Sequence, residues 1–101
     1  MNEATLKALL EQSGYPVAYH QFKTPLTPPY LVYLFTGTDN MGADNRVYHH
    51  EPSYQVELYT LAKNPAAEQA VEALLNSQDI YWEKSETYIQ SEKLYQVVYE
   101  I

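Results

Sequence analysis

The chain has 101 residues, a formal net charge of −7 and no cysteine. This length suffices for one domain with a hydrophobic core, and the lack of cysteine excludes disulfides and thiolate metal sites. The six basic residues form no cluster and thirteen acidic residues outnumber them, which argues against a specific nucleic-acid binder.

The first 29 residues are predicted to form a helix, a strand and a connector. Asn2 can cap the helix, and Gly14 suits its end. Three apolar residues recur at helical spacing: Leu6, Leu9 and Leu10. Residues 17–22 alternate as a strand does, and the proline-rich residues 23–29 indicate a stiff, extended connector.

The middle of the chain is predicted to hold most of the sheet. Residues 30–36 are β-branched and aromatic and apolar on both faces, which favours a central strand. Residues 53–60 alternate cleanly, so one face of that strand should be buried. Between them, residues 37–46 contain two glycines and four Asp or Asn residues, which indicates a long polar loop. Residues 46–50 are then a short strand that Pro52 interrupts.

A second helix is predicted to start at the Asn-Pro pair 64–65, with asparagine as the cap and proline at the first helical position. It should end in a turn at residues 76–79. Residues 80–84 read as a strand, residues 85–93 as a polar connection, and residues 94–101 as a last strand.

The predicted order is therefore α-β-β-β-β-α-β-β. Successive strands joined by turns favour a mainly antiparallel sheet, against which the two helices can bury their apolar stripes. We expect an α+β fold, a two-layer sandwich, with residues 1–101 forming a single domain. No apolar run approaches the roughly 20 residues of a membrane span, and the N-terminus lacks the features of a secretory signal.

A search for catalytic and metal-binding patterns favours a protein that is not an enzyme and needs no cofactor. There is no cysteine nucleophile, no serine lies in a Gly-x-Ser-x-Gly motif, and no glycine-rich loop opens a helix. His49 and Glu51 lie on one face of a strand and could share a metal, but one pair is not a site. The four Asp and Asn residues of the loop do not have the spacing of a calcium loop, so turn chemistry is the better interpretation.

Tyrosine is the one unusual residue type, with eleven copies. Tyrosine is enriched at protein interfaces because it combines an apolar ring with a polar tip. Many of the tyrosines also alternate within predicted strands, where a two-faced sheet accommodates aromatic residues without any partner. Both interpretations stay open.

Several segments together resemble the small structural proteins encoded with the tail genes of long-tailed phages and prophages of Gram-positive bacteria. The segments are PYLVY at 29–33, GTDN at 37–40, ADNRVY at 43–48, YQVELY at 54–59, YWEKSETYI at 81–89 and SEKLYQVVYE at 91–100. The size and element order are similar to those of tail terminator, or tail completion, proteins.

This resemblance implies a ring, commonly of six subunits, that caps the head-proximal end of the tail tube and docks to the neck. The implied partners are further copies of the chain, the tail tube protein and the neck or head–tail connector protein. The implied location is the virion tail or neck, and the bacterial cytoplasm during assembly. DNA passing through the ring would suit an acidic subunit that does not grip phosphates. The alternatives are a head–tail joining protein and a small acidic regulatory domain that binds another protein.

Under this interpretation the polar loop is the predicted partner-contact site, because of its length and its Gly and Asx content. It is expected to protrude toward the tube or the next subunit. The residues assigned to this contact are Asp39, Asn40, Met41, Asp44, Asn45 and Arg46.

Overall fold

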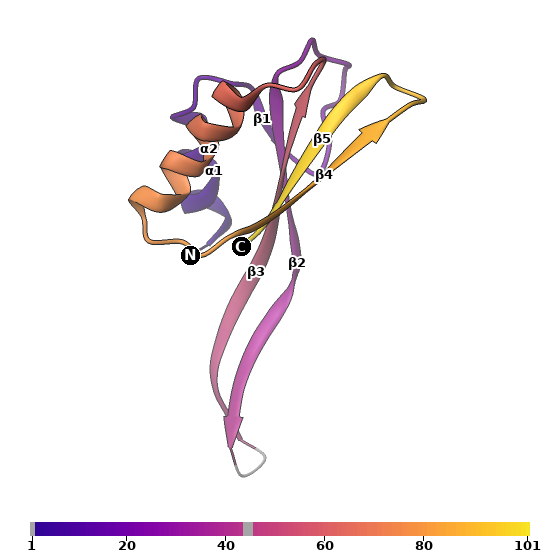
Figure 1. Cartoon of the computed structure of the whole chain (residues 1–101). Helices are drawn as coiled ribbons and strands as arrows, with labels where there is room; N and C mark the ends of the chain where they lie inside the picture. Colours follow the sequence, from indigo (N-terminus) through magenta and orange to yellow (C-terminus); the bar gives the residue numbers. More distant parts are fainter. Residues whose placement is uncertain (1, 44–45) are drawn as a thin grey trace.

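The computed structural model describes the backbone of residues 2–43 and 46–101 and the side chains of residues 2–37 and 52–101. It has a mixed α+β fold, as predicted, with two helices and one five-stranded sheet (Figure 1). The elements in chain order are α1 (Glu3–Glu11), β1 (Val17–Tyr19), β2 (Tyr30–Ala43), β3 (Arg46–Thr60), α2 (Pro65–Ser77), β4 (Glu83–Ile89) and β5 (Leu94–Glu100). The strand order in the sheet is β1-β2-β3-β5-β4; β1 and β2 are parallel, and the other neighbours are antiparallel.

Both predicted helix caps are confirmed. The Asn2 side chain accepts a hydrogen bond from the backbone N–H of Thr5 at 2.8 Å, and that of Asn64 accepts one from Ala67 at 3.1 Å. Each bond satisfies a donor that the first turn of a helix leaves without a partner, and Pro65 lacks a donor at the position where none is needed. These local interactions fix where the two helices start.

The core lies between the two helices and one face of the sheet (Figure 1). The predicted alternation in β3 is confirmed, because Tyr54, Val56 and Leu58 are buried while the residues between them are half-buried. The other buried members of this core are Leu6, Leu9, Leu10, Leu31, Tyr33, Ala67, Val71, Leu75, Val97 and Tyr99. Below, the face of the sheet that points away from the helices is called the outer face.

The predicted first strand is too long, because β1 ends at Tyr19 rather than at residue 22. His20 takes a left-handed conformation (φ 67°), which ends an extended strand. The chain then crosses to the start of β2. On the way, the ring of Phe22 packs edge-on against the ring of Tyr30, with 5.3 Å between the ring centroids. This crossover helps to bury Val32 on the outer face of β2.

The predicted polar loop over residues 37–46 is wrong. Residues 37–43 continue β2, and they pair with residues 46–53 in one long antiparallel ladder. Two register shifts, between Phe35 and Gly37 and between Met41 and Gly42, accommodate the irregular sequence. Gly37 has a φ of 152°, which strongly favours glycine, so its glycine marks a bulge rather than the start of a loop.

Pro52 does not interrupt β3, and the two strands predicted on either side of it are one. Tyr54 exchanges two backbone hydrogen bonds with Ile101, so the polar backbone groups of Tyr54 point away from β2. Backbone orientation alternates along a strand, so the nitrogen of Pro52 points away from β2 as well. Its missing N–H therefore costs no hydrogen bond of the β2–β3 ladder.

The predicted strand at residues 80–84 is also wrong, because β4 spans Glu83–Ile89, inside the predicted polar connection. Every residue of β4 except Ile89 is exposed, since this strand forms an edge of the sheet. Such a strand needs no apolar alternation, which is why its sequence resembles a loop. With one strand fewer before α2, the order is α-β-β-β-α-β-β.

Candidate functional site

The distinctive feature of the molecule is a long β-hairpin, here called the arm, formed by residues 37–43 of β2 and 46–53 of β3. Figure 1 shows that the arm extends well beyond the helices and the rest of the sheet. The molecule measures 49 × 28 × 24 Å along its principal axes. The arm thus accounts for the elongated shape.

Along the arm each strand has only one neighbour in the described part of the chain. β1 pairs with β2 only at residues 31–33, and the ladder between β5 and β3 covers residues 55–60 of β3. The Tyr54–Ile101 bonds are the last contact on that side. An isolated two-stranded hairpin is marginally stable in water, so an arm of this kind gains most from a protein partner.

The described members of the predicted contact set lie on the arm, in strands rather than in a loop. Asp39, Asn40 and Met41 lie in β2, and Arg46 begins β3 opposite Ala43. Asp44 and Asn45 lie outside the described residues. The register places Asp39 opposite Glu51, Asn40 opposite His50 and Met41 opposite His49.

The expectation that His49 and Glu51 alone do not make a metal site stays a prediction, because their side chains lie outside the described ones. Among the side chains that the structure describes, no group of three or more His, Cys, Asp or Glu residues is placed to hold a metal ion.

A groove of about 410 Å³ lies at the root of the arm, where β4 and β5 meet the continuing strand β3. It is called the root groove below, and its lining is Thr36, Ser53, Tyr54, Gln55, Tyr81, Glu83, Glu100 and Ile101. Glu83 and Glu100 are both exposed and lie directly opposite each other on neighbouring strands. Tyr81 is 77% exposed, and its hydroxyl donates a hydrogen bond to Oε1 of Glu83 at 2.8 Å.

The outer face of the sheet carries a polar network centred on Glu57. Its carboxylate accepts hydrogen bonds from Nε2 of Gln55 at 2.6 Å and from the hydroxyl of Tyr59 at 2.7 Å. The Tyr59 oxygen in turn accepts one from Nε2 of Gln96 at 2.8 Å. Burial, followed by the bond to Glu57, raises the pKa of Tyr59 well above its usual value. Each oxygen of the Glu57 carboxylate thus accepts one hydrogen bond from a neighbouring side chain of the same strand.

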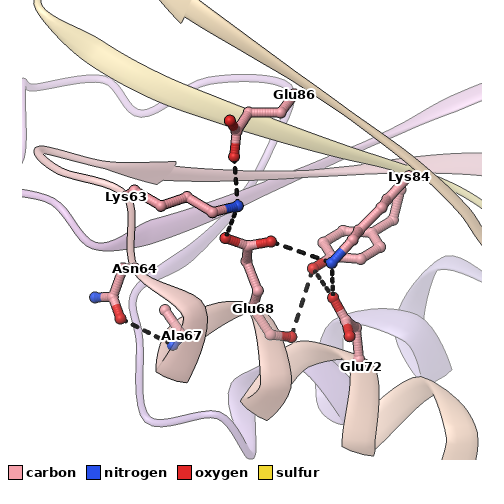
Figure 2. Close-up of polar contacts among 8 residues, drawn as sticks. Lys63, Asn64, Ala67, Glu68, Glu72, Lys84 and Glu86 are labelled. Atoms are coloured by element: carbon pink, nitrogen blue, oxygen red, sulfur yellow. Dashed lines mark hydrogen bonds and ion pairs between the residues drawn. The ribbon is translucent and has the colours of Figure 1, made fainter.

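On the helix side, an ion-pair network joins α2 to β4 (Figure 2). The carboxylate of the buried Glu68 forms ion pairs with Nζ of Lys63 at 2.6 Å and with Nζ of Lys84 at 3.2 Å. Lys63 also pairs with Glu86 at 2.6 Å, and Lys84 with Glu72 at 2.8 Å. All these carboxylates are engaged by cations, so the network is best understood as structural.

The electrostatics of Glu68 agree with a structural role. Burial by itself would raise the pKa of Glu68, but the hydrogen bonds from Lys63 and Lys84 outweigh it and hold that pKa below its usual value. Burial and the bond from its hydroxyl to Glu72 at 2.8 Å raise the pKa of Tyr99.

Sequence reasoning missed the root groove and the network. Glu83 and Glu100 are distant in the sequence and meet only through the β4–β5 ladder, so no local pattern indicates them. The one available signal for the network was Glu68 and Glu72, which lie one helical turn apart on α2.

Comparison with known proteins gives no family: no protein-family model matches the chain, and no curated protein matches it. Among the described residues, neither helix has the length and apolar character needed to cross a membrane.

Proposed function

We propose that this chain is a structural protein of a phage or prophage virion, and specifically the tail terminator subunit. It would form a ring, of six subunits as the resemblance implies, that caps the head-proximal end of the tail tube. The arm is the observation that carries the proposal. It is a long protrusion whose backbone edges have no partner in the described chain, as expected of an element that binds another protein.

The position of the arm favours assembly into a ring. The arm and the surface it would bind lie on different parts of the subunit, so each contact is heterologous and a repeated set of them can close a ring. In this proposal the subunit is a two-layer sandwich, with helices on one side and the outer face of the sheet on the other. The arm reaches beyond both layers to the tube or to the next subunit.

The charge distribution is compatible with DNA passing through such a ring. The outer face in the body of the sheet carries Glu57, Glu83 and Glu100, and its described strand positions include no lysine or arginine. A surface of this kind repels phosphates rather than binding them. It supports a passage role and gives no support to specific nucleic-acid binding.

The test is light scattering during size-exclusion chromatography, with and without the tail tube protein. The matched variant replaces residues 38–52 with an Asn-Gly turn, which joins the register partners Gly37 and Ser53. We expect the full chain to form a ring or to bind and cap tubes, and the armless variant to stay folded and monomeric. A full chain that ignores tubes, or an armless variant that still caps them, would refute the proposal.

A head–tail joining protein is the second candidate, because the same arm would suit it. The partner distinguishes the two functions: a joining protein binds the connector and leaves tube length unchanged, whereas a terminator limits tube length.

A further inference from the structure

We propose that the sheets of neighbouring copies join edge to edge, with β4 of one copy pairing antiparallel with residues 37–43 of β2 in the next. The inference rests on the proposed ring and names the two surfaces that meet between its subunits.

The first of these surfaces is β4, a free edge of the sheet along its whole length. Its one neighbour among the described residues is β5, and the register between the two strands runs without a shift. Ile101 exchanges hydrogen bonds with Tyr54 of β3, so the backbone of Glu100 is turned the other way, toward β4. Its partner Glu83 is turned toward β5. Because backbone orientation alternates, the N–H and C=O groups that point away from the sheet are those of residues 84, 86 and 88.

β4 lacks the features that usually protect an exposed edge. Proteins prevent unwanted strand pairing with prolines, bulges or lysines along such edges. β4 contains no proline, and its register with β5 shows no bulge. Its one lysine, Lys84, is bound to Glu68 and Glu72 on α2. The edge is therefore open to another strand.

The second surface is the β2 edge of the arm. The β3 edge is the poorer of the two, because Pro52 is turned away from β2 and supplies no N–H there. Thr38 lies opposite Pro52, so its backbone groups are turned away from β3. By alternation, the outward backbone groups of β2 in the arm are those of residues 38, 40 and 42, none of which is a proline. No described strand covers them, since β1 pairs with β2 only at residues 31–33.

The two edges match each other in length and in direction. β4 has seven residues, and the segment 37–43 has the same length. Each presents outward backbone groups at every second residue. β4 runs opposite to β2 within one copy, so the joined strands are antiparallel when the sheet continues from copy to copy without turning over.

The strand order identifies the occupant of each edge as a second copy. β4 closes one side of the sheet, and the β2 edge of the arm lies on the opposite side, so the two edges of one subunit cannot meet. A contact between different surfaces is heterologous, and its repetition can close a ring. Joining β4 to the arm therefore gives every subunit the same two neighbours.

The levels of the strands suit a closed ring rather than a flat sheet. Across the ladders Glu83 lies level with Leu34, and the rest of β4 runs back toward the start of β2. The free edge of β2 lies beyond that level, at residues 37–43, so each join is staggered along the strands. A closed sheet requires such a stagger, because it tilts the strands against the ring axis.

Disulfide trapping tests the contact, because the native chain has no cysteine to interfere. With residue 86 opposite residue 40 at the centre of the join, Asp39 lies directly opposite Thr87. Asp39→Cys and Thr87→Cys variants are mixed under oxidising conditions, with and without tail tubes. In the control, Glu51→Cys replaces Asp39→Cys, since Glu51 lies opposite Asp39 on β3 and one strand farther from the incoming β4.

The control is discriminating because disulfides are short. They join residues whose Cα atoms lie within about 7 Å, whereas two strand spacings separate position 51 from the incoming strand by about 10 Å. We expect a disulfide-linked dimer from the first mixture and at most a trace from the control. Equal yields, more dimer from the control, or no dimer from the first mixture under either condition would overturn the inference.

Proline substitution gives a second readout. Asn40→Pro removes an outward N–H from the β2 edge, and His50→Pro removes one at the same level from the β3 edge. We expect Asn40→Pro to weaken self-association roughly threefold to tenfold, as loss of one hydrogen bond would, and His50→Pro to leave it unchanged. Equal weakening by the two variants would mean that proline acts by distorting the arm, and the pairing would be wrong.

Tube capping by the unmodified chain is scored separately. Capping without the disulfide removes only this inference, whereas a disulfide without capping removes only the terminator assignment.

Discussion

The substitution Glu68→Gln tests whether the α2–β4 network stabilises the fold. Glu68 has a side chain only 5% exposed and receives two lysine ammonium groups, Lys63 at 2.6 Å and Lys84 at 3.2 Å. Glutamine keeps the shape of the side chain, removes the charge and turns an amide donor toward a cation. The change therefore isolates the electrostatic contribution of one buried carboxylate.

The expected loss in the free energy of unfolding depends on how buried the carboxylate and the two lysine ammonium groups are. A hydrogen bond to a charged group contributes about 1.5–3 kcal/mol, whereas exposed ion pairs contribute about 0–1 kcal/mol. The side chains of Lys63 and Lys84 are 49% and 40% exposed, so solvent screening lowers the value. We expect Glu68→Gln to lower the free energy of unfolding by about 1–2 kcal/mol at pH 7. With a urea m-value of about 1–3 kcal/mol/M, the midpoint of the urea titration should fall by roughly 0.3–2 M.

The pH dependence supplies the sign check. The pKa of Glu68 is lowered in the folded state, so its stabilising contribution is present above its unfolded pKa of about 4.3. That contribution is lost as pH falls through the lower folded pKa. Urea unfolding followed by circular dichroism should therefore show a clear difference between wild type and Glu68→Gln at pH 7. The difference should shrink steadily as pH falls below about 4.3.

Glu86→Gln is the matched control. Glu86 pairs with the same Lys63 at the same 2.6 Å, but its side chain is 39% exposed. We expect it to change stability by no more than about 0.5 kcal/mol. Equal losses for the two variants, or a Glu68→Gln loss that is the same at pH 7 and below pH 4, would refute the reasoning.

Three further predictions concern the sheet. The pKa of Tyr59 is raised in the folded state, so the contribution of Tyr59 to the free energy of unfolding is complete below about pH 10 and is lost as pH rises through the folded pKa. Urea unfolding curves at pH 8 and 11 should therefore show a smaller loss of stability at pH 11 for Tyr59→Phe than for the wild type. Equal losses in the two proteins would contradict this. Pro52→Thr restores an N–H on the free edge of β3, so light scattering at high concentration should reveal more self-association, and unchanged scattering would count against a free edge there. Leu58 is fully buried, so Leu58→Ala should cost about 2–5 kcal/mol in a urea titration, and a loss under 1 kcal/mol would place the core elsewhere.

The sequence by itself determined the features that rest on local chemistry. Asn2 and Asn64 cap helices because a side-chain oxygen can reach an N–H of the first turn wherever the helix later packs. The alternation from Tyr54 to Leu58 predicted the buried face of β3, since side chains point to opposite faces of any strand. The mixed α+β class follows from such local signals together.

Only the tertiary structure decided which backbone segments pair. Residues 37–43 have the glycine and Asx content of a loop, yet hydrogen bonds to residues 46–53 and two register shifts make them the arm. The exposed strand β4 has no apolar alternation and exists because β5 supplies its ladder. The root groove likewise depends on Glu83 meeting Glu100 across that ladder. Pairing of distant segments is a non-local interaction, and local propensity and periodicity do not encode it.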